Sequence, residues 1–321
     1  MSNTPSFEFA STSEEVASAF ASEIKGKNVL ITGTSINSLG FEAARVCAKY
    51  GANLVIITGQ NENRLKLAHE ALQKEVSHGN FRPLRLDLSL FSATRAAAEV
   101  VNAYPEHIDL LLNNAASNIC PFELTADGLE RQLQTDHVGP FLFTALVFPK
   151  LLASPLPHPR VVWTASGAHG WCDGVDLAEL EKPNEATYTA MRAYAQSKTA
   201  NILTAREFAR REQRVTTLSL SPGAVATNFV TNQTARATLT ASNIVDDDGQ
   251  PNLSSLPWKT MQQGVSTIIV AAFDPSLTDK SGSYLRDCVV DNTALAPHAI
   301  DDVHAGKLWA LTERLVGVKF L

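Results

Sequence analysis

Short apolar runs alternate with helix-like segments along most of this chain, and that alternation constrains the fold more than any other feature. The runs are continuous, as in strands covered on both faces, and the segments between them repeat apolar residues at helical spacing. We therefore expect one α/β domain built on a doubly wound parallel sheet of about seven strands. The expected strands span residues 29–32, 54–57, 83–87, 108–113, 160–165 and 215–221, and the expected helices span residues 41–50, 62–76, 90–103, 126–152 and 191–211.

Two polar stretches fall outside this pattern. Residues 1–24 are rich in Ser, Thr, Ala and Glu, so we expect a polar N-terminal extension before a single domain over residues 25–321. Residues 228–257 contain three consecutive aspartates followed by Gly249, a composition typical of a loop or lid.

The charge balance argues against several classes of partner. With a formal net charge of -6 and a pI near 5.8, the chain lacks the basic surface that attracts nucleic acid or an anionic membrane. No apolar run reaches the roughly 18 residues of a membrane span, and the first 24 residues contain no Lys or Arg, unlike a signal peptide. We expect a cytoplasmic protein. The four cysteines are widely spaced and form no Cys-x-x-Cys pair, so no metal site is expected.

Three polar side chains predict a site that interconverts a carbonyl and an alcohol. Tyr194 and Lys198 stand four residues apart in a helical segment and so share one face of the helix. The lysine charge favours the phenolate form of the tyrosine, which can then exchange a proton with an alcohol near neutral pH. Ser166, at the end of an apolar run, would hold the same oxygen. The four-residue spacing alone is weak evidence, because it also occurs by chance.

A glycine-bearing turn follows the first expected strand and leads into a helix, at residues 32–40. Gly33 and Gly40 would let backbone amides approach a pyrophosphate at the helix N-terminus, as in a Rossmann-type fold. An ordinary tight turn explains this loop equally well. The turn becomes specific evidence for dinucleotide binding only together with further motifs in the chain.

Five motifs in this order resemble the short-chain dehydrogenase/reductase family, and the resemblance covers about residues 27–227. They are the turn at residues 32–40, Asn113-Asn114-Ala115-Ala116, Ser166, Tyr194-x-x-x-Lys198 and Pro222-Gly223-x-Val225-x-Thr227. The phrases at residues 137–144 and 197–203 are similar to the branch of retinol dehydrogenases and WW-domain oxidoreductases.

The resemblance implies a role for each matching position. Lys198 would bind the nicotinamide ribose and tune Tyr194, Asn114 would lie beside the adenosine ribose, and Thr227 would hold the nicotinamide carboxamide. Each of these positions also has an ordinary structural explanation, for example Asp87 as a helix cap. The implied cofactor-binding residues are Gly33, Ser35, Ser38, Leu39, Gly40, Gln60, Asp87, Leu88, Asn114, Ala115, Tyr194, Lys198, Pro222, Gly223, Val225 and Thr227.

Two positions depart from the family pattern within the site. Asp136 stands where the family usually has an Asn that is associated with a kinked helix and a proton path from the lysine. Its negative charge would favour the protonated forms of Lys198 and Tyr194, so we expect Asp136 to act in the catalytic group. Ser38 replaces the middle glycine of the fingerprint, which would loosen contact with the phosphates.

The residues after the second strand bear on the choice of dinucleotide. Gly59 stands where NAD-dependent relatives carry an acidic residue, so nothing would repel a 2′-phosphate. Gln60 stands where NADP-dependent relatives often carry Arg and offers only neutral hydrogen bonds. We expect NADP(H) to be preferred, with NAD(H) as the second candidate.

The predicted function is an NADP(H)-dependent oxidoreductase for a neutral, fairly apolar ketone, aldehyde or alcohol. Trp171, Phe229 and Trp258 are candidates for the apolar pocket wall. A catalytically quiet relative that binds dinucleotide as a redox sensor or scaffold is the alternative, because Asp136 and Ser38 depart from the pattern. The resemblance is compatible with a homodimer or a homotetramer.

Overall fold

The computed structural model is built around one large sheet and describes residues 6–117, 119–231 and 233–321; the side chains of Phe229 and Thr231 also lie outside the described part. The sheet has eight strands in the order β10-β9-β6-β5-β4-β1-β2-β3. All neighbouring strands are parallel except the edge pair β9 and β10. The strands are β1 (Asn28–Ile31), β2 (Leu54–Gly59), β3 (Phe81–Arg85), β4 (Leu110–Asn113), β5 (Arg160–Thr164), β6 (Thr216–Ser221), β9 (Tyr284–Arg286) and β10 (Val289–Val290).

This arrangement confirms the predicted doubly wound α/β fold. The seven mutually parallel strands correspond to the expected number, and the short antiparallel strand β10 extends the edge of the sheet. The strand order reverses direction between β1 and β4, which creates the crevice where such sheets bind ligands.

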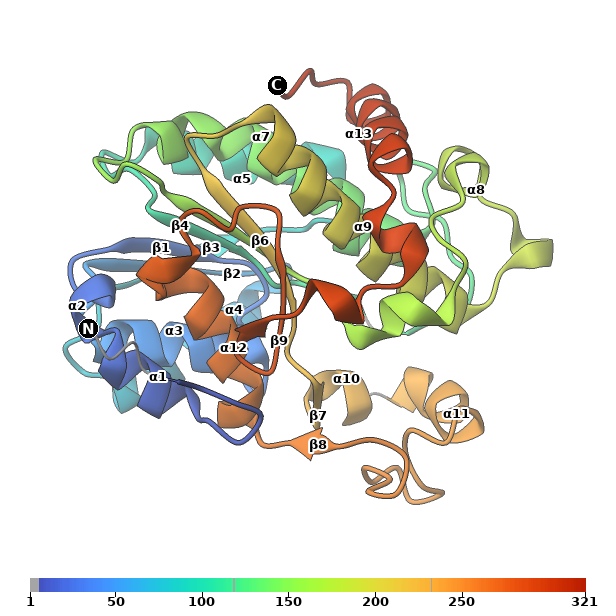
Figure 1. Ribbon diagram of the computed structural model, residues 1–321, viewed down its shortest axis with the longest axis horizontal. Coiled ribbons are helices and arrows are strands. Elements are labelled where there is room, and N and C mark those ends of the chain that lie inside the picture. Colours follow the sequence, from blue (N-terminus) through green and yellow to red (C-terminus); the bar gives the residue numbers. More distant parts are fainter. Residues whose placement is uncertain (1–5, 118, 232) are drawn as a thin grey trace.

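Helices cover both faces of the sheet in two layers, and a hydrophobic core lies between each layer and the sheet (Figure 1). One layer holds α1 (Ser13–Ala19), α2 (Ala21–Ile24), α3 (Leu39–Lys49), α4 (Glu62–Glu75) and α12 (Met261–Phe273). The other holds α5 (Phe91–Ala103), α7 (Gly139–Leu152), α9 (Ala190–Arg211) and α13 (Asp302–Val316). Short helices α6 (Arg131–Leu133) and α8 (Leu177–Glu181) lie in the connections. No helix of the described residues is long and apolar enough to cross a membrane.

The expected helix at residues 126–152 starts later and is not uniform. The Glu130 side chain caps α6 by accepting from the amides of Gln132 and Leu133, which ends the preceding turn. A π-helical segment, Gln134–Val138, then joins α6 to α7. Such bulges are frequent at functional sites, and this one carries Asp136.

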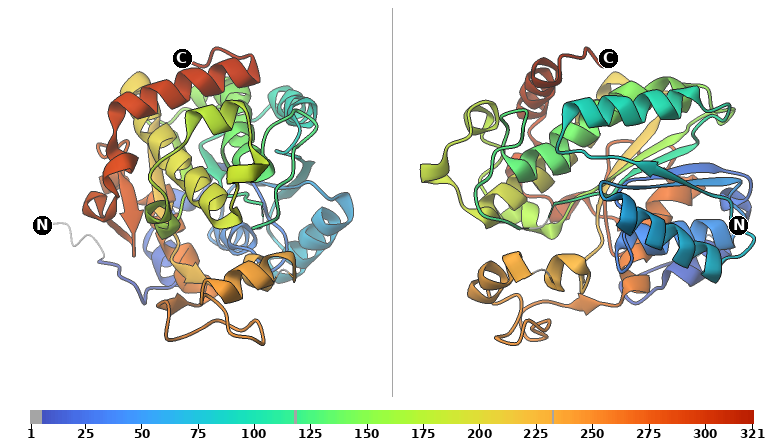
Figure 2. Two further views of the ribbon diagram at one scale, coloured as in Figure 1. Left: turned by 90° about the vertical axis from the view of Figure 1, so that its right-hand side faces the viewer. Right: turned by 180° about the vertical axis from the view of Figure 1, so that it is seen from behind.

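The residues expected to form a loop or lid, 228–257, contain two helices in their first half. These helices are α10 (Asn228–Thr231) and α11 (Gln233–Ala241). Strand β8 (Trp258–Lys259), which pairs in parallel with β7 (Ala224–Val225), directly follows the segment. Figure 2 shows that α10 and α11 stand apart from both helix layers. A compact segment of this kind can cover a cleft as a lid.

The described part of the N-terminal segment, residues 6–24, packs on the domain. The apolar side chains of Val16 and Phe20 join the core beside α12 and α3. Ser13 donates a hydrogen bond to Glu42 (2.7 Å), and Glu14 forms ion pairs with Arg45 (2.7 Å) and Lys49 (2.8 Å). This segment is therefore fixed to α3, the helix that follows β1.

Candidate active site

A cleft of about 1330 Å³ follows the carboxyl ends of the parallel strands. This volume exceeds the range of about 300–1,000 Å³ that holds a single small ligand, so a dinucleotide and a substrate can share it. Most of the predicted site residues line it, whereas Gly40, Asp87 and Asp136 do not. Those that line the cleft are Gly33, Ser35, Ser38, Leu39, Gln60, Leu88, Asn114, Ala115, Ser166, Tyr194, Lys198, Pro222, Gly223, Val225 and Thr227.

A buried ion pair lies at the floor of the cleft. The Nζ atom of Lys198 is 3.0 Å from the Oδ2 atom of Asp136, and the two side chains are 3% and 0% exposed. Burial alone lowers the pKa of Lys198, but the Asp136 charge and Tyr194 outweigh it, so the pKa stands above its usual range. The same ammonium is 5.3 Å from the centre of the Tyr194 ring. Lys198 therefore stays positively charged beside Tyr194.

Asp136 is held by donors on three sides. Its Oδ1 atom accepts from the Ser117 amide (2.6 Å), and its Oδ2 atom accepts from the Ser197 hydroxyl (3.2 Å) in addition to the ion pair. A carboxylate supplies two acceptor oxygens for these donors, whereas an Asn supplies one. The surroundings thus suit the charged residue that departs from the family pattern.

Ser166 follows β5 and begins a 3₁₀ turn, Gly167–Trp171. Its hydroxyl accepts from the amide of Ala168 (3.1 Å), which leaves its own proton available for another acceptor. The ring of His169 fixes this turn: Nδ1 lies 2.8 Å from the carbonyl oxygen of Ser166, and Nε2 accepts from the amide of Ala296 (3.2 Å). Local sequence patterns do not single out His169, because its partner Ala296 is remote in the chain.

The glycine turn depends on glycine at both predicted positions. Gly33 has φ +73°, and a Cβ atom there would lie 2.8 Å from the Ala115 Cα atom. A Cβ atom on Gly40 would lie 2.4 Å from the carbonyl oxygen of Gly33 and 2.7 Å from the side-chain Nδ2 atom of Asn114. Gly40 therefore allows α3 to approach the turn, and Asn114 fixes the turn by donating to Thr32 (3.0 Å) and Gly33 (3.1 Å).

Ser38 is the N-cap of α3. Its hydroxyl accepts from the amide of Phe41 (3.2 Å) and donates to the carbonyl of Gly33 (3.3 Å). The serine that replaces a glycine thus closes the turn by hydrogen bonds. The backbone amides of a helix N-terminus favour an anion at this position, so the turn fits the pyrophosphate of a dinucleotide.

The far end of the cleft is polar and carries a cation that sequence reasoning missed. Gln60 and Asn61 lie there beside Arg64, an exposed residue in the first turn of α4 that forms no ion pair with a described residue. The position of Arg64, one helical turn after Gln60, is the sequence feature that could have indicated this cation. Asp87 instead accepts from the amide (3.0 Å) and hydroxyl (2.6 Å) of Ser89, so its place among the cofactor-binding residues remains a prediction.

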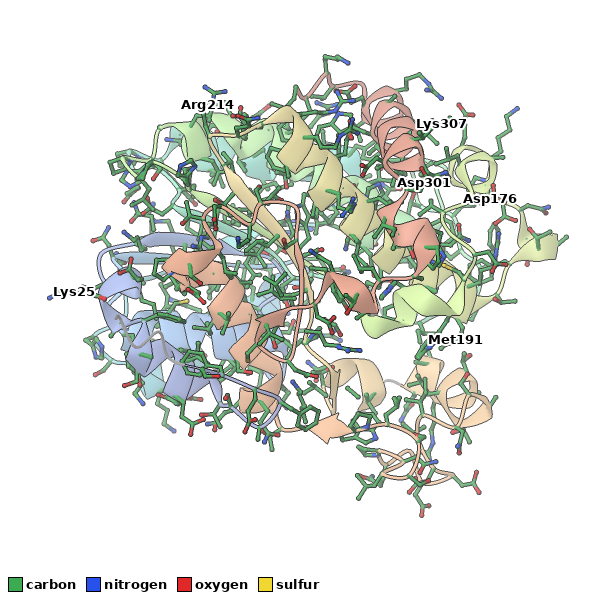
Figure 3. The ribbon with its side chains drawn as sticks, in the orientation of Figure 1. Lys25, Asp176, Met191, Arg214, Asp301 and Lys307 are labelled. Carbon is green, nitrogen blue, oxygen red and sulfur yellow. The ribbon has the colours of Figure 1, made fainter. Side chains whose placement is uncertain are left out.

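The lid supplies an apolar wall next to Tyr194. Val230, Ile244 and Trp258 belong to a small hydrophobic cluster that also contains Ile119 and Met191. Figure 3 shows Met191, at the start of α9, facing the lid helices α10 and α11. Trp171 and Trp258 both line the cleft, as expected of a pocket wall, whereas the side chain of Phe229 lies outside the described residues.

Comparison with known proteins identifies the family. Residues 27–171 match the model of the short chain dehydrogenase family. A Brassica napus protein named short-chain dehydrogenase TIC 32 A, chloroplastic, is 32% identical over 96% of this chain and 93% of its own length. The chain belongs to the short-chain dehydrogenase family. It is therefore an NAD(P)-dependent oxidoreductase, and the family predicted from the motifs is confirmed.

Other relatives of this short-chain dehydrogenase agree with the predicted branch. Human retinol dehydrogenase 12 is 32% identical over 93% of this chain and 89% of its own length. Human WW domain-containing oxidoreductase is 31% identical over 92% of this chain and 69% of its own length. The cytoplasmic location expected above remains a prediction.

Solved structures reproduce the fold of this short-chain dehydrogenase. An uncharacterised protein from Mycobacterium Paratuberculosis has a TM-score of 0.68 and 27% identity, covering 93% of this chain and 96% of its own. A short chain dehydrogenase from Escherichia coli, solved as its NADPH complex, has a TM-score of 0.60 and 22% identity, covering 82% and 97%. At this identity the second likeness concerns the fold alone.

Proposed function

We propose that this short-chain dehydrogenase interconverts an apolar carbonyl compound and its alcohol, with NADP(H) as the preferred cofactor and Tyr194 as general acid and base. The observation that carries the proposal is the buried pair of Lys198 and Asp136 beneath the Tyr194 ring. Such a pair fixes one positive charge beside a phenol in a cleft that also contains Ser166.

Each of these side chains has a distinct task. Tyr194 gives its proton to the substrate oxygen during reduction and takes it back during oxidation. Lys198 stabilises the phenolate that remains after reduction, because its ammonium stays charged beside the ring. Ser166 donates its free proton to the same substrate oxygen and so orients the carbonyl. The bound nicotinamide supplies or accepts the hydride.

The glycine turn and the polar far end would hold the dinucleotide. The absent Cβ atoms of Gly33 and Gly40 keep the turn close-packed, and the N-terminus of α3 faces the pyrophosphate site. Gly59 places no carboxylate near a 2′-phosphate, and Arg64 supplies the positive charge that Gln60 lacks. These residues support a preference for NADP(H) over NAD(H).

The surroundings of Tyr194 favour a neutral, apolar substrate. The lid cluster contributes aliphatic and aromatic side chains, and the cations near this part of the cleft are paired: Arg131 with Glu123, and Arg286 with Asp291 (2.7 Å). An anionic substrate would therefore find no unpaired partner among them.

The direct test is a screen of apolar ketones, aldehydes and secondary alcohols with each dinucleotide, following the absorbance of the reduced nicotinamide. We expect turnover with NADP(H) and slower turnover with NAD(H). Tight binding of a dinucleotide with no turnover of any substrate in the screen would favour the alternative of a redox-sensing or scaffold protein.

A contact of Arg64 with the 2′-phosphate has its own test. Arg64→Gln should raise the Kd of NADPH about tenfold or more, as expected for a lost charge-assisted hydrogen bond, and leave the Kd of NADH unchanged. Lys66→Gln is the matched control, because Lys66 is on the same helix, is exposed and does not line the cleft. Equal effects of the two substitutions would contradict this assignment.

A further inference from the structure

A second buried lysine lies next to the cleft. Lys259, at the end of β8, has a fully buried side chain, although lysine ammonium groups rarely leave solvent. Its Nζ atom is 2.6 Å from the Oδ1 atom of Asp287, in an ion pair that lacks the direction of a hydrogen bond. Only the lysine of this pair is buried, because the Asp287 side chain is 37% exposed. Removing an ammonium from water is unfavourable unless its partners offset the lost hydration, so the buried position of Lys259 suggests a role beyond stability.

The stem of Lys259 supports the loop between β6 and β7. A Cβ atom on Gly223 would lie 3.0 Å from the Cδ atom and 3.2 Å from the Cε atom of Lys259. Gly223 has φ +83°, a conformation that favours glycine. The pairing of Val225 with Lys259 aligns the lysine with this loop. The loop therefore rests directly on the lysine.

The Asp287 carboxylate is aimed by an uncommon turn. Asp287 and Cys288 have φ angles of 51° and 69°, which residues other than glycine seldom adopt. Helix α12 holds this turn, because the Cys288 amide donates to the Thr267 hydroxyl (3.1 Å) and the Cys288 thiol lies 3.1 Å from the Ser266 hydroxyl. The strained turn connecting β9 and β10 thus keeps a carboxylate beside Lys259.

The N-terminal segment completes the surroundings of Lys259. The ammonium lies 4.5 Å from the centre of the Phe9 ring, within the range of a cation–π contact. Gln263, in the first turn of α12, donates to the carbonyl of Ala10 (3.3 Å) and holds this part of the chain in place. Phe9, Gly223 and Asp287 all line the cleft.

We propose that Phe9, Lys259 and Asp287 form a support for the loop at residues 222–227, so that the N-terminal segment belongs to the dinucleotide site. Lys259 acts as a positioning residue, because it contacts the loop and does not line the cleft. The inference rests on the proposed cofactor and on the family resemblance, which implies that Thr227 of this loop holds the nicotinamide carboxamide. The support joins three segments that are far apart in the sequence.

The test separates the two halves of the cofactor. Calorimetric titration gives the Kd of NADPH, which needs both halves, and of 2′,5′-ADP, which occupies the adenosine half alone. Lys259→Met keeps the unbranched stem and removes the charge. It should raise the Kd of NADPH about fivefold or more and change the Kd of 2′,5′-ADP by less than about twofold. Lys280→Met is the matched control, because it removes the exposed ion pair between Lys280 and Asp279. It should change neither the Kd of NADPH nor the Kd of 2′,5′-ADP.

Variants of Phe9 provide a second route if Lys259→Met does not fold. Phe9→Leu removes the aromatic face and should weaken NADPH in the same selective way, whereas Phe9→Tyr keeps the face and should retain wild-type binding. Equal loss of both ligands, or no loss in either variant, would overturn the inference. Failure of the wild type to bind either ligand would instead refute the proposed cofactor.

Discussion

Replacing Asp136 with Asn should destabilise the protein through Lys198. At 3.0 Å and an effective dielectric constant of about 20, the two charges attract by about 5 kcal/mol. The variant leaves the buried ammonium without its counter-ion, and the single oxygen of Asn cannot serve the Ser117 amide, the Ser197 hydroxyl and Lys198 together. Removing one partner of a buried pair typically costs about 3–5 kcal/mol, so we expect a loss of about 3 kcal/mol in the free energy of unfolding at neutral pH.

The difference in unfolding free energy between the wild type and Asp136→Asn should decrease as the pH rises. In the wild type the pKa of Lys198 is raised. The ion pair therefore contributes its full stabilisation at pH values below the usual pKa of lysine. This stabilisation is lost only as the pH rises through the pKa of Lys198 in the folded protein. In the variant burial acts without the Asp136 charge and lowers the pKa of Lys198. The unfolded variant then binds more protons than the folded one, so its stability increases with pH by up to about 1.4 kcal/mol per pH unit.

Urea unfolding followed by circular dichroism measures both effects, at about pH 7 and about pH 9.5. Asp279→Asn is the matched control, because it makes the same chemical change in an exposed pair with Lys280 and should cost less than about 1 kcal/mol. The reasoning fails if Asp136→Asn costs no more than Asp279→Asn, or if the difference between wild type and Asp136→Asn does not narrow at the higher pH.

Three further predictions concern catalysis and cofactor choice. Tyr194→Phe should fold and bind dinucleotide but lower kcat by about 10²–10⁴-fold; turnover at the wild-type rate would exclude Tyr194 as the acid and base. Gln60→Arg should tighten NADPH about tenfold or more and Gly59→Asp should shift binding toward NADH, so tighter binding of NADH by the wild type would refute the preference. Alcohol oxidation by the wild type should peak at higher pH than in Asp136→Asn, since the carboxylate favours the protonated site; superimposable kcat profiles would show that Asp136 takes no electrostatic part.

The sequence was most informative where local periodicity decides structure. Continuous apolar runs marked the buried strands because both faces of a parallel sheet are covered, and the four-residue spacing placed Tyr194 and Lys198 on one face of α9. The sequence was less informative about where a helix departs from regular α-helical geometry. The π-helical segment at Asp136 depends on how Glu130 caps the turn before it, which residue periodicity does not record.

Contacts between remote segments were not predictable from local patterns. Residues 1–24 have a polar composition, yet Val16 of α1 and Phe20, the residue that caps α1, reach the core beside α12. Lys259 has an ordinary sequence context, and only the fold brings Phe9 and Asp287 to it. Arg64 could have been noticed from its position after β2, but only the structure shows that it is exposed and forms no ion pair with a described residue.

The most direct test of the account follows hydride transfer itself. The enzyme is incubated with an apolar ketone identified in the substrate screen and NADPH that carries deuterium at both hydrogen positions of C4 of the reduced nicotinamide, and the product alcohol is analysed by mass spectrometry. The account predicts deuterium on the carbinol carbon with the wild type and a strongly reduced yield with Tyr194→Phe. Product without deuterium, or equal yields from the two proteins, would contradict a hydride-transfer site that relies on Tyr194.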